Sequence, residues 1–98
     1  MFIGTAKICI HLQGVITLKD KRRIVKSLIE RLKSRFNVSA AEIDRLDNKQ
    51  MAVIGFAVVS NDRTFTISQV DTIMQFIYND GRFYVGVVKT DVSAFEEI

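Results

Sequence analysis

The sequence predicts one α+β domain, residues 1–98, in which two helices lie on one face of a four-stranded antiparallel sheet. Three observations support this fold class. The first segment alternates apolar and polar residues, two later segments repeat apolar residues with a helical period, and the segments follow the order β-α-β-β-α-β. The chain is 48% hydrophobic and 26% charged, as globular domains are, and its 98 residues are enough for one core.

The first strand is expected over residues 2–12, because apolar and polar side chains alternate there with a period of two. Gln13-Gly14 ends this segment, since such residues favour turns. The face expected toward the core consists of Phe2, Ala6, Ile8, Ile10 and Leu12, with Gly4 among them.

The first helix is expected from Thr17, its N-cap, to about Phe36, and Asp20 suits the helix N-terminus. Asn37 can end the helix, because asparagine tolerates the left-handed conformation common at helix C-termini. Spacing of about 100° per residue gathers the apolar side chains into one stripe. This stripe consists of Ile24, Val25, Leu28, Ile29, Leu32 and Phe36.

Two further strands are expected over residues 38–44 and 51–60, joined by a hairpin turn at Asp47-Asn48. The second of these strands is apolar on both faces, which is typical of a central strand that is covered from both sides.

A second helix is expected from residues 60–62 to about Asn79, and the last strand over residues 83–92, followed by a loose tail. Alternation places Phe83, Val85 and Val87 on one face of that strand, and Tyr84 and Val88 on the other. With right-handed crossovers, this order of elements gives a ferredoxin-like sandwich whose central strands are the first and the third.

Two helices cover only one face of such a sheet, so the apolar residues of its other face need a second explanation. Exposed apolar patches of this size usually mark an interaction site. We therefore expect the open face to pack against a second copy of the protein, as a homodimer. The alternative is that the C-terminal tail, with Phe95 and Ile98, folds over it.

The net charge of +3 is unevenly distributed. From Lys19 to Arg35, eight basic residues face two acidic ones, a balance of +6, whereas the other residues sum to −3. Cations at a helix N-terminus oppose the helix dipole, and a polyanion would offset that cost. A solvated helix face is the competing interpretation. The candidate nucleic-acid-binding residues are Lys19, Lys21, Arg22, Arg23, Lys26 and Lys33.

Two ferredoxin-like families offer comparisons. The segment Gly55-Phe56-Ala57-Val58 resembles the third-strand signature of RNA-recognition motifs, and Phe2-Ile3-Gly4 resembles the first-strand one. Stacking of bases needs aromatic side chains on the open sheet face, but Phe2 is expected on the core face. A stacking platform is therefore not favoured.

The segment Leu12-Gln13-Gly14-Val15 resembles the phosphate-binding turn of acylphosphatases, and Asn48 could orient a water molecule. Leu18 stands where that family has its arginine, so bidentate binding of an acyl phosphate is not expected. A hydrolase remains the third hypothesis, and we expect no catalytic residues.

No metal or cofactor is expected. Cys9 and His11 lie on the same face of one strand, but a zinc site needs three or four ligands. Glu42, Asp44 and Asp47 are better explained as a solvated edge strand. The single cysteine, the lack of a leader-like N-terminus and the lack of a long apolar run favour a cytoplasmic protein without a membrane anchor.

Three segments, residues 18–28, 36–44 and 55–62, together resemble the YlxP-like family of small bacterial proteins of unknown function. The Leu-Lys-Asp-Lys-Arg run and the Val-Val-Ser-Asn-Asp run carry this resemblance. It implies a ferredoxin-like fold and no established activity. The genomic neighbourhood of that family implies a role in RNA metabolism or ribosome maturation.

The leading hypothesis from the sequence is a non-catalytic factor that binds RNA or a ribosomal particle through its first helix. The second is a protein-interaction module that uses the apolar sheet face.

Overall fold

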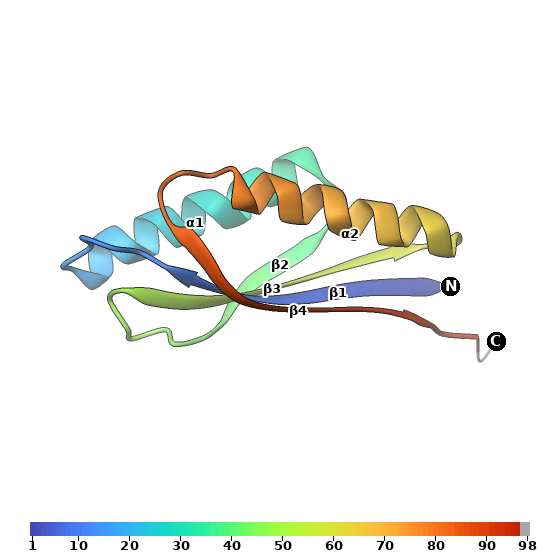
Figure 1. Cartoon of the computed structure of the whole chain (residues 1–98), viewed down its shortest axis with the longest axis horizontal. Coiled ribbons are helices and arrows are strands. Elements are labelled where there is room, and N and C mark those ends of the chain that lie inside the picture. The colour runs from blue at the N-terminus through green and yellow to red at the C-terminus, as the bar shows by residue number, and fades with distance from the viewer. Residues whose placement is uncertain (97–98) are drawn as a thin grey trace.

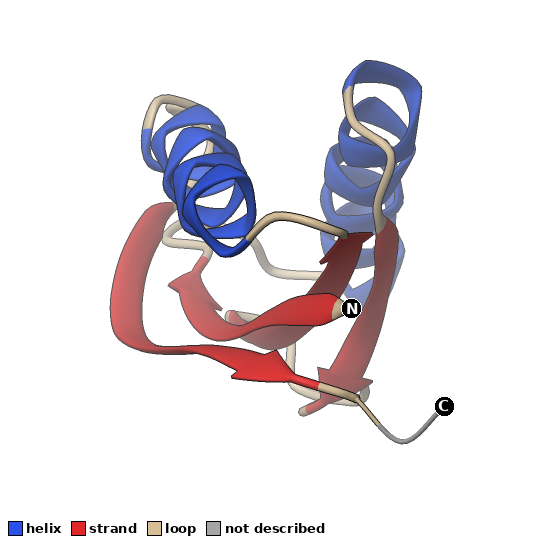
Figure 2. Cartoon of the chain, turned by 90° about the vertical axis from the view of Figure 1, so that its right-hand side faces the viewer, coloured by secondary structure: helices blue, strands red, loops and turns tan. Residues whose placement is uncertain are grey.

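A computed structural model of the chain describes residues 1–96 and confirms the predicted fold class (Figure 1). Four strands form one antiparallel sheet in the order β2-β3-β1-β4, and both helices lie on the same face of it (Figure 2). The elements are β1 (Phe2–His11), α1 (Leu18–Arg35), β2 (Ser39–Asp44), β3 (Met51–Ser60), α2 (Arg63–Tyr78) and β4 (Tyr84–Ala94).

The core lies between the sheet and the helices, on the face that alternation predicted for β1. Ile8 and Ile10 are fully buried there, opposite Ile54 and Ala52 of β3. Helix α2 approaches β1 so closely that a Cβ on Gly4 would lie 2.6 Å from a methyl group of Val70. Glycine at this position therefore sets how tightly the helix packs.

The start of α1 is as predicted, whereas its end differs. The backbone N–H of Asp20 donates to the Thr17 hydroxyl at 3.1 Å, which confirms the N-cap. The helix ends at Arg35, and Phe36 is an extended C-cap. Asn37 is not left-handed, because Arg45 is the one non-glycine residue with positive φ in the described chain.

The faces of β4 also differ from the prediction. A bulge interrupts the pairing of β4 with β1, so Val85 and Val88 lie opposite Ile10 and Ile8 on the same, helix-covered face. One additional residue in β4 reverses the alternation beyond it. Val87 consequently lies exposed within the bulge, and does not share a face with Val85.

The C-terminal segment extends the sheet. The N–H of Phe95 donates to the carbonyl of Met1 at 2.8 Å, so the chain continues beside β1 and does not fold back at this point. Ile98, the other residue of the predicted cover, lies outside the described residues. Within residues 1–96, neither helix is long and apolar enough to cross a membrane.

Candidate nucleic-acid interface

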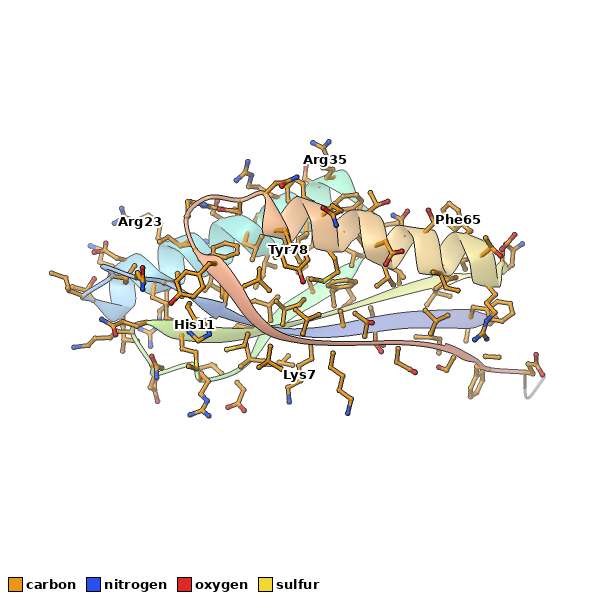
Figure 3. The ribbon with its side chains drawn as sticks, in the orientation of Figure 1. Lys7, His11, Arg23, Arg35, Phe65 and Tyr78 are labelled. Carbon is orange, nitrogen blue, oxygen red and sulfur yellow. The ribbon has the colours of Figure 1, made fainter. Side chains whose placement is uncertain are left out.

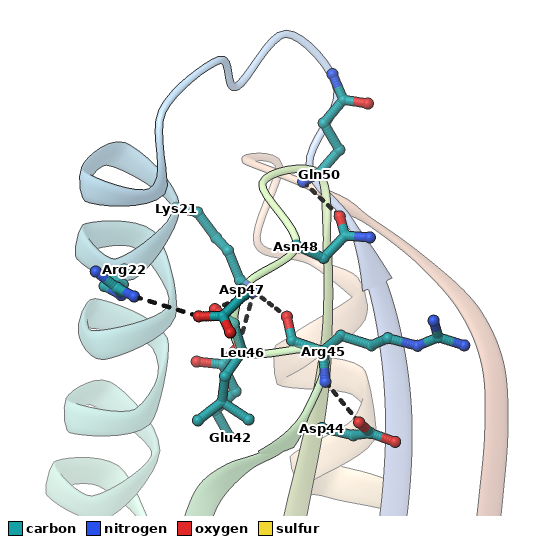
Figure 4. A network of polar contacts seen from close by, with 9 residues as sticks. All are labelled: Lys21, Arg22, Glu42, Asp44, Arg45, Leu46, Asp47, Asn48 and Gln50. Carbon is teal, nitrogen blue, oxygen red and sulfur yellow. Dashed lines mark hydrogen bonds and ion pairs between the residues drawn. The ribbon is translucent and has the colours of Figure 1, made fainter.

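Lys21 occupies a different environment from the other cations of α1. Its side chain is fully buried, and the ammonium group donates to the carbonyls of Arg45 at 2.6 Å and Leu46 at 3.3 Å (Figure 4). The same nitrogen lies 2.9 Å from Glu42 Oε2. That oxygen has no aligned hydrogen bond from any described donor, so charge attraction holds the pair.

These contacts tie α1 to the β2–β3 loop and leave Lys21 no surface with which to contact a phosphate. Two of its N–H groups donate to the loop carbonyls, and the ammonium charge faces the Glu42 carboxylate, so each of its contacts lies inside the protein. The prediction that Lys21 belongs to the nucleic-acid interface is therefore corrected, because the residue anchors the loop from inside.

The other predicted cations of α1 are exposed, and their ion pairs are long. Arg22 lies 3.8 Å from Asp47, and Arg23 lies 3.4 Å from Asp20. Lys26 lies 3.9 Å from Glu30 one helical turn later. Exposed pairs of this kind contribute about 0–1 kcal/mol each and compete weakly with another anion. In the described part of the chain, Lys19 and Lys33 form no ion pair.

The exposed surface of α1 remains strongly basic without Lys21. Seven exposed cations face the two carboxylates of the helix, a balance of +5. Two of these cations, Arg31 and Arg35, were not among the candidate residues. They lie on the side toward α2, with their guanidinium carbons 5.8 and 5.3 Å from the centre of the Phe76 ring. Their spacing of one helical turn is the sequence signal for this second row.

Arg31 also borders an ion pair in the turn between α2 and β4. Asp80, almost inaccessible to solvent, receives two 2.7 Å hydrogen bonds from Arg82 and lies 3.6 Å from Arg31. Burial raises the pKa of Asp80, but the hydrogen bonds and charges of the two arginines outweigh it and lower that pKa below 3.8. Arg82 is therefore committed to Asp80 and is not a free cation.

The face of the sheet opposite the helices divides into two halves. Over β2 and β3 it is apolar, and Ile43 of β2 lies across Gly55, where a Cβ would meet it at 3.0 Å. Over β1 and β4 it is polar, with Lys7 paired directly opposite Lys89. Figure 3 shows that Lys7 projects from this face, whereas Arg23 and Arg35 project from the helical layer.

The model of a family described as "Protein of unknown function (DUF503)" matches residues 3–90. The chain belongs to the DUF503 family. The uncharacterized protein YlxP of Bacillus subtilis (strain 168) is 36% identical over 61 residues, which are 62% of this chain. The match spans 66% of that relative, just under two thirds of its length.

A solved structure adds support for the fold alone. The de novo designed protein Foldit4 superposes with a TM-score of 0.53 at 15% identity, covering 98% of this chain and 100% of the designed one. The predicted family resemblance is thus confirmed, and membership of DUF503 assigns no activity.

The turn that resembles acylphosphatases lines a pocket of about 340 Å³ at one end of this DUF503 domain. Gln13 and Gly14 face Asn48 across it, as the hydrolase hypothesis required. None of the described residues that line the pocket is an arginine or a lysine. The pocket therefore offers no cation to an acyl phosphate, and its polar groups are amides and aromatic rings.

The aromatic residue of the β3 segment that resembles RNA-recognition motifs lies on the core side of the sheet, away from the open face where bases would stack. Phe56 is buried in the core beneath the helices. A different aromatic pair, His11 and Tyr84, stacks with ring centres 5.2 Å apart and was not predicted from the sequence. Cys9 Sγ lies 3.8 Å from His11 Nε2. Among residues 1–96, no three His, Cys, Asp or Glu side chains gather as metal ligands would.

Proposed function

We propose that this DUF503 protein is a non-catalytic RNA-binding factor that contacts phosphates through the exposed face of α1. The contact residues in this proposal are Lys19, Arg22, Arg23, Lys26 and Lys33. The observation that supports it is the balance of +5 on the exposed surface of one helix, whose ion pairs are 3.4–3.9 Å long and exposed.

Crowded cations on one helix repel each other, and those in its first turn oppose the helix dipole. Weak surface pairs offset little of this cost, because solvent screens them. Phosphate groups offset more of this cost. When lysines and arginines neutralise the phosphates, the counterions bound to the nucleic acid are released. Binding of this kind depends on charge density and falls as the salt concentration rises.

The test measures the affinity of the full chain for ribosomal RNA by filter binding across a series of salt concentrations. The test variant carries Arg22→Gln, Arg23→Gln and Lys26→Gln. If each cation neutralises one phosphate of single-stranded RNA, the slope of log K against log salt should fall by about 2. Binding by this variant with an unchanged slope would contradict the proposal.

A charge-matched control removes three exposed cations elsewhere, as Arg45→Gln, Lys49→Gln and Arg63→Gln. This control has the same net charge as the α1 variant, so it separates a located interface from a general effect of charge. We expect its salt slope to stay near that of the wild type. Equal losses in the two variants would argue against a site on α1.

A second candidate function, self-association through the β2–β3 half of the open face, is favoured by one observation. Val59 of β3 is 60% exposed on that face. Val59→Lys should convert a dimer to a monomer in sedimentation equilibrium. Ile16→Lys, at a more exposed apolar residue in a loop away from the sheet, should leave the dimer intact. A wild type that stays monomeric at about 100 µM would exclude this candidate, because a specific dimer should form at concentrations above its dissociation constant.

A further inference from the structure

Two lysines face each other on the open side of the sheet, and Asp91, opposite Thr5 on the same face, forms an ion pair with neither. Lys7 of β1 and Lys89 of β4 are direct cross-strand partners, and neither forms an ion pair within residues 1–96. Like charges in this position destabilise a sheet. Lysines often protect edge strands, but β1 is a central strand, so edge protection does not explain Lys7.

Four residues further along β1, at its C-terminal end, the same face carries the aromatic pair. His11 and Tyr84 are cross-strand partners whose rings stack with an interplanar angle of 20°. Gly86 provides the room for this arrangement, because a Cβ there would lie 2.5 Å from His11 Nε2. Its φ is not in the left-handed region, so a side chain at this position would meet the histidine ring and not strain the backbone.

The aromatic pair forms one wall of the pocket at the end of the sheet. The remaining polar lining comes from the amides of Gln13, Asn48 and Gln50, and Gln13 donates to the Tyr84 hydroxyl at 3.2 Å. Its volume of about 340 Å³ is at the lower end of the range for small-ligand sites. Planar rings beside amide donors and acceptors match the face and the edge of a nucleobase.

We propose that the β1–β4 half of the open face binds single-stranded nucleic acid. A base stacks on the Tyr84–His11 pair at the pocket, and a phosphate lies between Lys7 and Lys89, about 13 Å away along β1. One sheet face of this fold contacts two or three bases in RNA-recognition motifs, which is compatible with that separation. The site lies opposite the helical layer, so it is separate from α1 and is tested independently of it.

The test uses fluorescence anisotropy with a labelled ten-nucleotide oligouridine and with the same strand in an RNA duplex. Tyr84→Leu removes the stacking ring, and Tyr78→Leu on α2 is its matched control, since the two tyrosines are 51% and 52% exposed. Loss of one base stack should weaken single-strand binding by about 5- to 150-fold. The control should bind within twofold of the wild type.

Three results would overturn this site. These are a Tyr84→Leu variant that binds as the wild type does, an equal loss in the Tyr78→Leu control, and a duplex bound as tightly as the single strand. Circular dichroism confirms that each variant is folded before it is measured. If Tyr84→Leu weakens binding while the α1 variant does not, the sheet site stands and the proposed function of α1 fails.

Two further variants test the parts of the site separately. Gly86→Ala displaces the His11 ring without altering a charge, so it should weaken binding with an unchanged salt slope. Lys7→Gln with Lys89→Gln should lower the slope by about 0.7, as expected for the loss of one phosphate contact on a single strand. An unchanged slope in the double variant would remove the phosphate from this position.

Discussion

Replacing Lys21 by methionine tests whether the buried ammonium holds α1 to the β2–β3 loop. The substitution keeps an apolar chain of similar length and removes the nitrogen that contacts Glu42, Arg45 and Leu46. Glu42 is then left with its side chain only 15% exposed and without its counter-charge. Removing one partner of a buried pair costs about 3–5 kcal/mol.

A loss of this size is a large share of the stability of a small domain, which is about 5–15 kcal/mol. At about 4–8 °C per kcal/mol, the melting temperature should fall by at least about 12 °C. Urea unfolding at pH 7, followed by circular dichroism, measures the free energy directly. The matched control is Lys26→Met on the same helix, whose exposed pair with Glu30 should change stability by at most about 1 kcal/mol.

The double variant Lys21→Met with Glu42→Leu separates the buried charge from lost packing. Because no unpaired carboxylate remains, it should be more stable than Lys21→Met alone by at least about 1 kcal/mol. A Lys21→Met variant that loses no more than the Lys26→Met control would refute the reasoning. In that case the loop would be held by other contacts.

Two other substitutions probe the packing and the pH dependence. Asp80→Asn should lower the free energy of unfolding at pH 7. Because folding lowers the pKa of Asp80, the difference in stability between wild type and variant should disappear as pH falls below 3.8. Urea unfolding from pH 7 to pH 2 measures this difference, and a difference that persists at pH 2 would contradict the role of the Asp80 carboxylate. Gly4→Ala should cost about 1–3 kcal/mol, because its Cβ would lie 2.6 Å from a methyl group of Val70. Thermal unfolding tests this, and an unchanged melting temperature would contradict the prediction.

Periodicity was sufficient to predict the elements and the core face of the sheet. Ile8 and Ile10 follow a period of two, and Val25, Leu28 and Leu32 follow a helical period, so burial could be assigned without coordinates. Lys21 lies four residues before Val25, on the same face of the helix, so the helical period also predicts its burial. Its charge, and not its position, made it a candidate for the surface.

The aromatic pair and the bulge were beyond the reach of the sequence. Pairing of His11 with Tyr84 joins residues 73 positions apart, and it depends on the register that the bulge near Val87 sets. A shift by one residue exchanges the faces of a strand. Gly86 is compatible with a bulge in β4, but a glycine alone does not fix the register beyond it. Residues that are brought together by strand register can therefore be identified only from the structure, whereas residues that share a helix face can be identified from the sequence.

The two proposed surfaces lie on opposite sides of the sheet but meet at one end of the molecule. Gln13 and Gly14 line the pocket beside Tyr84, and the same loop leads to Thr17, the N-cap of α1, and then to Lys19. A single strand that enters the pocket can reach the cations of α1 by crossing this loop, without passing through the sheet. Simultaneous use of both surfaces therefore requires a strand long enough to pass around this end. A short oligonucleotide should depend on Tyr84 more strongly than on α1, because only a longer RNA can reach both.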